Sequence, residues 1–210
     1  MRRYFKKYNS GFSLVELLVS LSIMVVILTV VVSSQSVYTD TASISNLADE
    51  ISITLSQSQA YGIAVRELTP GSSDFSVSYG LTFSLLSGGS NSAYLFFADR
   101  NANNIYDGDW TCPTGGSSEC LEKVSITHGN YIDSICIIRE GEADVCNTSK
   151  RLDVNFVRPD TDARIVFFND GGQTFTVPNM TGARIILKTP RDNSRSVLVY
   201  TNGQISVEGP

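Results

Sequence analysis

Five side chains with oxygen donors cluster between residues 99 and 109, where their spacing could hold a metal ion: Asp99, Asn101, Asn103, Asp107 and Asp109. The first four occupy the first, third, fifth and ninth positions of a calcium-type loop. The sixth position, usually Gly, is Asn104, and the twelfth, usually a bidentate Glu, is Trp110. One interpretation is a calcium site that stiffens the loop. The alternative is a polar turn, in which Asn and Asp side chains accept hydrogen bonds from nearby backbone amides.

Four cysteines could form disulfides or bind zinc: Cys112, Cys120, Cys136 and Cys146. Four cysteines allow three pairings, and the short intervals favour Cys112 with Cys120 and Cys136 with Cys146. Neither pair has the spacing of a zinc knuckle, and His128 is the only histidine. We therefore expect two disulfides, in a part of the chain that lies outside the cytoplasm, where disulfides persist.

Catalytic and nucleic-acid-binding functions have weaker support in the sequence. We find no set of nucleophile, base and orienting group, so we expect no enzyme activity. The formal net charge is −5, which disfavours a general nucleic-acid coat because such affinity comes from neutralising phosphates. Four basic residues gather late in the chain, and they indicate either a solvated hairpin edge or, less favourably, a DNA contact: Arg184, Lys188, Arg191 and Arg195.

Glu16 is the only charged residue among the 21 residues from Phe12 to Val32. This apolar stretch is long enough for a helix that spans a hydrocarbon core of roughly 30 Å. A carboxylate at the centre of such a core costs on the order of 2.5–3.5 kcal/mol, so Glu16 is a candidate functional residue. Four basic residues and no acidic residue precede the stretch: Arg2, Arg3, Lys6 and Lys7. This bias predicts a single-pass protein with its N-terminus in the cytoplasm.

A short basic leader that ends in Gly11, followed by Phe12, by Glu16 and by about twenty apolar residues, resembles a type IV prepilin. The resemblance implies that a leader peptidase cuts between Gly11 and Phe12 and that the new amine of Phe12 is methylated. It also implies that Glu16 is an assembly residue, and that the partners are other pilin subunits, inner-membrane lipid and the leader peptidase. A secretory signal peptide would instead be cut after its apolar region.

The helix is expected to continue beyond the membrane. Residues 33–66 contain a single glycine and no proline, and one apolar stripe recurs at steps of three and four residues: Ile44, Leu47, Ile51 and Leu55. This stripe should be buried against a domain. Gly62 and the cluster of breakers at residues 69–74 predict the end of the helix.

Residues 67–210 have the alternating patterns of a β-rich head, so the expected fold class is α+β, with the long N-terminal helix packed on an antiparallel head. Asn202-Gly203 predicts the turn of a C-terminal hairpin. The other candidate strands are 75–79, 80–85, 93–97, 124–127, 132–138, 152–157, 164–168, 173–177 and 183–188, with 196–200 and 204–208 forming the hairpin.

The hairpin, the segment at residues 79–83 and the Asp/Asn loop are together similar to the FimT/GspH-type minor pilins and pseudopilins. The resemblance implies a structural subunit of a type IV pilus or of a type II secretion pseudopilus, with residues 1–11 as leader, 12–32 as membrane-spanning half-helix, 33–66 as exposed half-helix and 67–210 as extracytoplasmic head. The alternatives are a major pilin and a membrane-tethered adhesive or DNA-binding domain that does not polymerise.

Overall fold

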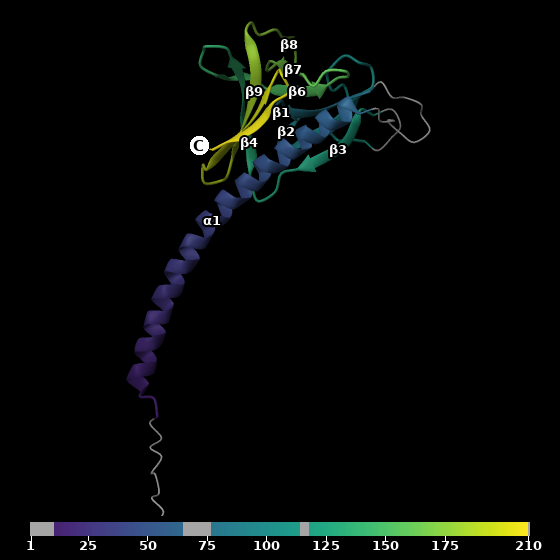
Figure 1. Ribbon diagram of the computed structural model, residues 1–210. Coiled ribbons are helices and arrows are strands. Elements are labelled where there is room, and N and C mark those ends of the chain that lie inside the picture. Colours follow the sequence, from purple (N-terminus) through teal and green to yellow (C-terminus); the bar gives the residue numbers. More distant parts are fainter. Residues whose placement is uncertain (1–10, 65–76, 114–117, 210) are drawn as a thin grey trace, which may run out of the picture. The chain divides into compact units, whose positions relative to one another are not determined.

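The computed structural model describes residues 11–64, 77–113 and 118–209. In these residues one helix, α1 (Leu14–Ile63), is followed by eleven strands, which form two antiparallel sheets (Figure 1). The expected α+β fold is thereby confirmed. The chain divides into two compact units, Met1–Thr39 and Asp40–Pro210, and we describe each unit by itself.

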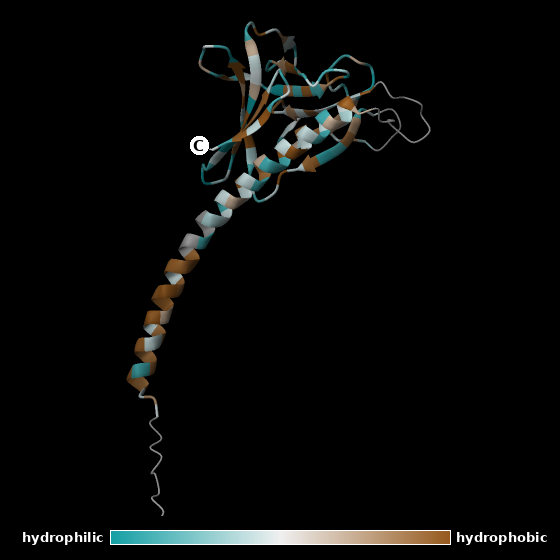
Figure 2. Ribbon diagram, in the orientation of Figure 1, coloured by the Kyte–Doolittle hydropathy of each residue, from teal (hydrophilic) through white to brown (hydrophobic). Residues whose placement is uncertain are grey.

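In the first unit, the N-terminal part of α1 is an exposed apolar helix. Residues Leu14–Val32 are long and apolar enough to cross a membrane, and none of this stretch is buried within the chain. Figure 2 shows the hydrophobic colour along this part of the ribbon. No second helix of this kind occurs in the residues that the structure describes. The stretch therefore indicates membrane anchoring.

The second unit begins with the rest of α1, which packs its apolar stripe into the core of the head. Ile44, Leu47, Ile51 and Leu55 are at most 6% exposed, so the prediction from their spacing is confirmed. Gly62 lies in the last turn of the helix, where an added Cβ would come within 2.4 Å of the Phe156 carbonyl oxygen. Its missing side chain lets the helix end approach the neighbouring strand, which is a packing role that we did not predict for it.

The larger sheet has the strand order β3-β2-β1-β6-β7-β8. Its strands are β1 (Ser78–Ser84), β2 (Ser90–Asp99), β3 (Cys120–Ser125), β6 (Arg151–Phe156), β7 (Ala163–Phe168) and β8 (Thr174–Phe175). All seven residues of β1 are buried, because this strand is central and its two faces are both covered.

The smaller sheet has the order β11-β10-β9-β4-β5. Its strands are β4 (Tyr131–Arg139), β5 (Val145–Ser149), β9 (Met180–Lys188), β10 (Ser194–Tyr200) and β11 (Ile205–Glu208). The predicted C-terminal hairpin is β10–β11, in register from Ser196 opposite Glu208 to Val199 opposite Ile205. Gly203 has a φ of 81°, which explains why a glycine is favoured in this turn.

One hydrophobic core joins α1 to both sheets, with Ile51 of the helix, Phe83 of β1 and Ile185 of β9 among its fully buried members. Several strands differ in extent from the sequence predictions. The expected strands 75–79 and 80–85 are one strand, β1, and residues 75 and 76 lie outside the described residues. The strand expected at 124–127 is β3, which begins earlier, and β5 was not predicted.

Candidate functional site

The N-terminal motif lies at the start of α1. Gly11, Phe12 and Ser13 precede the helix, and the backbone N–H of Glu16 donates a hydrogen bond of 3.2 Å to Ser13 Oγ. Ser13 is therefore the N-cap, and Glu16 stands at the third helical position, where a carboxylate also interacts favourably with the helix dipole. The Ser-x-x-Glu spacing is visible in the sequence, and we did not predict this capping role.

The surroundings of the motif are exposed and apolar. Phe12 is 77% exposed, and Glu16 is exposed as well. Of the 21 large hydrophobic side chains that are exposed in the described residues, 16 lie between Phe12 and Val32. A contiguous apolar surface of this kind marks a contact with lipid or with another protein. Within the described part of the chain, Glu16 forms no ion pair.

The Asp/Asn loop connects β2 to β3, and Asp99 attaches its first half to the sheet. Asp99 is 1% exposed. Its Oδ1 accepts the backbone N–H of Asn103 at 3.2 Å, and its Oδ2 accepts the backbone N–H of Asn104 at 2.8 Å. Asn155 Nδ2 also donates to Asp99 Oδ2, at 3.1 Å. The carboxylate is thus already occupied by donors of the protein.

The other predicted calcium ligands bond within the loop. Nδ2 of Asn101 and Nδ2 of Asn103 both donate to Asp107 Oδ2, while the two Asn side-chain oxygens accept backbone N–H groups two residues further on. Asp109 lies apart, and its Oδ1 accepts the backbone N–H of Thr111, which lowers the pKa of Asp109. This is the arrangement of the polar turn. In this arrangement amide N–H groups occupy Asp107, and the calcium interpretation stays a prediction.

No alternative cluster of metal ligands replaces it. In residues 11–64, 77–113 and 118–209 there is no group of three or more His, Cys, Asp or Glu side chains that could hold a metal ion.

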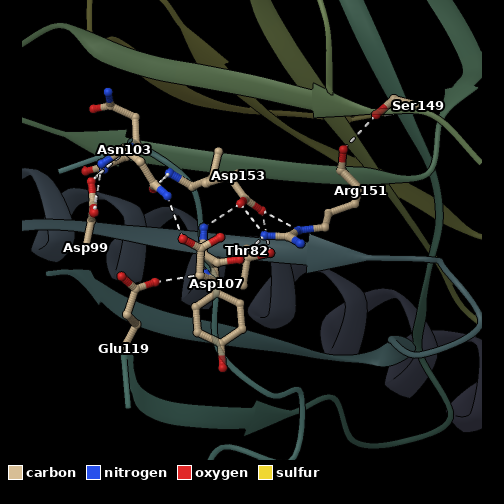
Figure 3. A network of polar contacts seen from close by, with 12 residues as sticks. Thr82, Asp99, Asn103, Asp107, Glu119, Ser149, Arg151 and Asp153 are labelled. Carbon is tan, nitrogen blue, oxygen red and sulfur yellow. Dashed lines mark hydrogen bonds and ion pairs between the residues drawn. The ribbon is translucent and has the colours of Figure 1, made fainter. Parts of the chain in front are cut away.

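A buried ion pair supports the second half of the loop. Asp153 of β6 is fully buried, and Arg151 donates to both of its carboxylate oxygens, with Nε at 2.9 Å. Asp153 also accepts the hydroxyl of Thr82 at 2.6 Å and the backbone N–H of Tyr106 at 2.8 Å. Figure 3 shows the guanidinium of Arg151 pointing toward Asp153 and Thr82. Both carboxylate oxygens of Asp153 therefore have their lone pairs satisfied by donors. Because one of these donors is the backbone N–H of Tyr106, the network holds the loop on the sheet.

Glu119 supports the loop from its other end. Its two oxygens accept the backbone N–H groups of Arg100, at 3.2 Å, and Asp107, at 2.8 Å. Burial raises the pKa of Glu119, although these hydrogen bonds oppose the shift. Burial also raises the pKa of Tyr106 to about 12, together with the charges of Asp109 and Glu119. The network holds the loop in place, and Tyr106 lies near Arg151 as well as near these acidic groups.

The four cysteines form two disulfides, Cys112–Cys120 and Cys136–Cys146, as the short intervals favoured. The first disulfide closes the end of the Asp/Asn loop onto the start of β3. The second joins the paired strands β4 and β5. Both constrain segments near sheet edges.

Acidic neighbours neutralise most of the basic group late in the chain. Arg184 pairs with Asp144 and Glu208, each at 2.7 Å. Lys188 pairs with Asp133 at 3.3 Å. Arg191 pairs with Asp40 at 2.8 Å, and Arg195 donates to Ser45 Oγ. These pairs favour the solvated hairpin edge over a DNA contact, because little positive charge is left for phosphates.

Comparison with known proteins gives one match. Residues 6–32 match the family model of the prokaryotic N-terminal methylation motif. The chain carries a prepilin-type methylation motif. The motif supports a type IV pilin-like subunit that assembles with other pilin subunits, and proteins with this motif are structural. Searches of curated proteins and of solved structures found no match, so the methylation motif is the feature that connects this chain to a family.

Proposed function

We propose that the protein is a structural subunit of a type IV pilus or of a type II secretion pseudopilus, anchored in the inner membrane and assembled through α1. The observation that carries the proposal is the exposed apolar surface between Phe12 and Val32, in which Glu16 is the only charged residue. A membrane anchor alone needs no charge in this stretch. A helix that leaves the lipid for a filament needs a feature that fixes its position among its neighbours.

The proposed role of Glu16 is to pair with a cationic amine. Cleavage after Gly11 would create the amine on Phe12, and methylation would leave its charge in place. The four leader charges would be lost with the cleaved peptide, which takes the formal net charge from −5 to −9. Glu16 lies one helical turn beyond Phe12, so in a filament it could meet the amine of a neighbouring subunit. An unpaired charge in a dry core is costly, and a matched pair recovers much of that cost.

The proposed topology has the leader in the cytoplasm and the head outside the cytoplasm. The basic leader supports this orientation, and so do the two disulfides, which belong to an oxidising compartment. Within the family we propose a minor subunit of the FimT/GspH type, on the basis of the β10–β11 hairpin and of the β1 segment. The presence of Glu16 suggests a subunit that docks onto another subunit.

Quantitative mass spectrometry of sheared surface filaments tests the proposal. We expect the protein in trace amounts relative to the most abundant filament subunit, and we expect Glu16→Leu to reduce its incorporation while the cleaved protein accumulates in the membrane. Glu142→Gln, a change of an exposed acidic residue in the head, is the matched control and should be incorporated normally. A high abundance would instead identify a major pilin. Complete absence of the wild-type protein from filaments would contradict the proposal. The remaining interpretation would then be a membrane-tethered domain that does not polymerise.

A further inference from the structure

A cavity of about 370 Å³ opens on the head where three connections meet. Its walls come from residues 84–89 between β1 and β2, residues 106–110 of the Asp/Asn loop, and residues 170–172 between β7 and β8, with Arg151 of β6 also lining it. The volume falls within the range of roughly 300–1,000 Å³ that is typical of small-molecule sites. Neither the filament proposal nor the methylation motif uses this cavity.

Arg151, which lines this cavity, has a donor that is unused among the described residues. Its Nε and Nη2 donate to Asp153, and its guanidinium lies 4.2 Å from the ring centroid of Phe168. The third nitrogen, Nη1, has no hydrogen-bond partner within the part of the chain that the structure describes. Because the other two nitrogens and the ring fix the guanidinium plane, Nη1 is a rigidly positioned pair of N–H donors.

The cavity combines this donor with an acceptor and with aromatic surface. Asp170 is exposed at the rim and forms no hydrogen bond through its side chain to any other described residue. Tyr106 and Trp110 contribute aromatic lining. The indole Nε1 of Trp110 is buried and lacks a partner among the described residues. A buried donor without a partner is unusual, and this donor belongs to a residue that lines the cavity.

Two of the glycines that line the cavity are Gly88 and Gly171. A Cβ added at Gly88 would meet no atom within 4 Å, and at Gly171 the nearest atom would be Asn169 Oδ1 at 3.3 Å. Neither residue has a positive φ. A side chain added at Gly88 would therefore extend into open space, whereas one at Gly171 would crowd Asn169.

The charges of the site select the chemical class of the ligand. Asp153 neutralises Arg151, and the exposed carboxylate of Asp170 adds a negative charge at the rim, so an anion is disfavoured. A cation would pair with Asp170, but it would offer no acceptor to the N–H groups of Arg151 Nη1 and Trp110 Nε1. A sugar ring fits both conditions, because it is neutral, its vicinal hydroxyls can donate to Asp170 and accept from Arg151, and its C–H face can pack on an aromatic ring.

We propose that this cavity binds a short neutral saccharide, with Asp170 and Arg151 holding the hydroxyl groups and with Trp110 packing against the ring. A subunit on the outside of the cell would then carry a carbohydrate-recognition site on its head.

Fluorescence of Trp110 tests the proposal, because it is the only tryptophan of the chain. The full-length protein is purified in a detergent without a sugar headgroup and is titrated with glucose, galactose, mannose, N-acetylglucosamine and their disaccharides. Glucuronate and glucosamine serve as the charged counterparts, and glycerol as a polyol without a ring. We expect a saturable change with at least one neutral sugar and weaker binding of its charged counterpart.

Two variants locate the site. Asp170→Asn removes the acceptor charge, and Gly88→Leu fills open space at the mouth. Each should weaken binding at least tenfold while the unfolding temperature is unchanged. Asp162→Asn, a change of another exposed Asp in the head, should bind like the wild type. The proposal is overturned if no neutral sugar gives a saturable change, if glucuronate or glucosamine binds more tightly, or if Gly88→Leu binds normally.

Discussion

Glu16 and Asp153 are both carboxylates among apolar residues, yet their surroundings differ in almost every respect. Asp153 is fully buried and accepts hydrogen bonds from Arg151, Thr82 and the Tyr106 backbone. Glu16 is exposed, and among the described residues its side chain has no ion-pair partner. A carboxylate whose partners are all in its own chain stabilises the fold. A carboxylate on an exposed apolar helix, with no ion pair among the described residues, is a candidate for a partner outside the chain.

The largest effect on stability should follow from Asp153→Ala. The change leaves the Arg151 guanidinium without its partner in a mostly buried position, and it also removes the acceptor of the Tyr106 N–H. We expect the free energy of unfolding of the head to fall by about 3–5 kcal/mol. Urea unfolding followed by Trp110 fluorescence measures this, with Asp162→Ala as the exposed control. A loss of under about 1 kcal/mol would show that the network does not stabilise the head.

Loss of the disulfide between β4 and β5 should have the next largest effect. The Cys136–Cys146 disulfide closes an interval of 10 residues, so the double variant Cys136→Ala and Cys146→Ala should lose about 2–3 kcal/mol of stability. The measurement is urea unfolding of the double variant and of the wild type in a detergent without a sugar headgroup. If the double variant and the wild type unfold at the same urea concentration, strand pairing alone holds this edge of the sheet.

Glu119 should produce a smaller, pH-dependent effect. Burial raises the pKa of its carboxyl in the folded protein above the ordinary value of 4.5. Between these two pKa values the folded protein binds more protons than the unfolded chain, so the contribution of Glu119 to stability rises as the pH falls from neutral toward about 4.5. Glu119→Gln lacks this titration. The free energy of unfolding of both proteins is measured at several pH values. On acidification, the wild type should gain stability relative to Glu119→Gln. A stability difference that does not change with pH would contradict the raised pKa of Glu119.

Glu16→Leu should give no change in the stability of the head, which is the smallest effect in the series. Its side chain is exposed, and it belongs to the unit Met1–Thr39 rather than to the head. Urea unfolding should therefore coincide with that of the wild type, even though incorporation into filaments falls. A shift of more than about 1 kcal/mol would mean that Glu16 has a partner within its own chain, and the contrast with Asp153 would be lost.

The N-terminal methylation motif and the apolar stretch after it could be predicted from sequence because their signals are local. The spacing of Gly11, Phe12 and Glu16, and the absence of other charges up to Val32, can be counted along the chain. The helical stripe, most strands and the disulfide pairing are likewise local or short in range. The Ser13 cap was equally local and could have been recognised from its Ser-x-x-Glu spacing.

The polar network in the head could not be predicted in the same way. Asp153 meets Thr82 and Tyr106 across 71 and 47 residues of sequence, and no spacing rule connects positions so far apart. The Asp/Asn loop shows most clearly that spacing alone does not determine side-chain contacts. Its spacing is compatible with a calcium ion and with a polar turn, and no spacing rule predicts that the Asn101 and Asn103 amides turn toward Asp107.

The most direct test of the account is the N-terminal mass and sequence of the protein isolated from its own cell membrane. Cleavage and methylation are required for Glu16 to meet a cationic amine in a filament. We expect the mature chain to begin at Phe12, with one methyl group on its amine and with the leader residues 1–11 absent. A chain that still begins at Met1, or one that is cut beyond Val32, would contradict assembly through this helix.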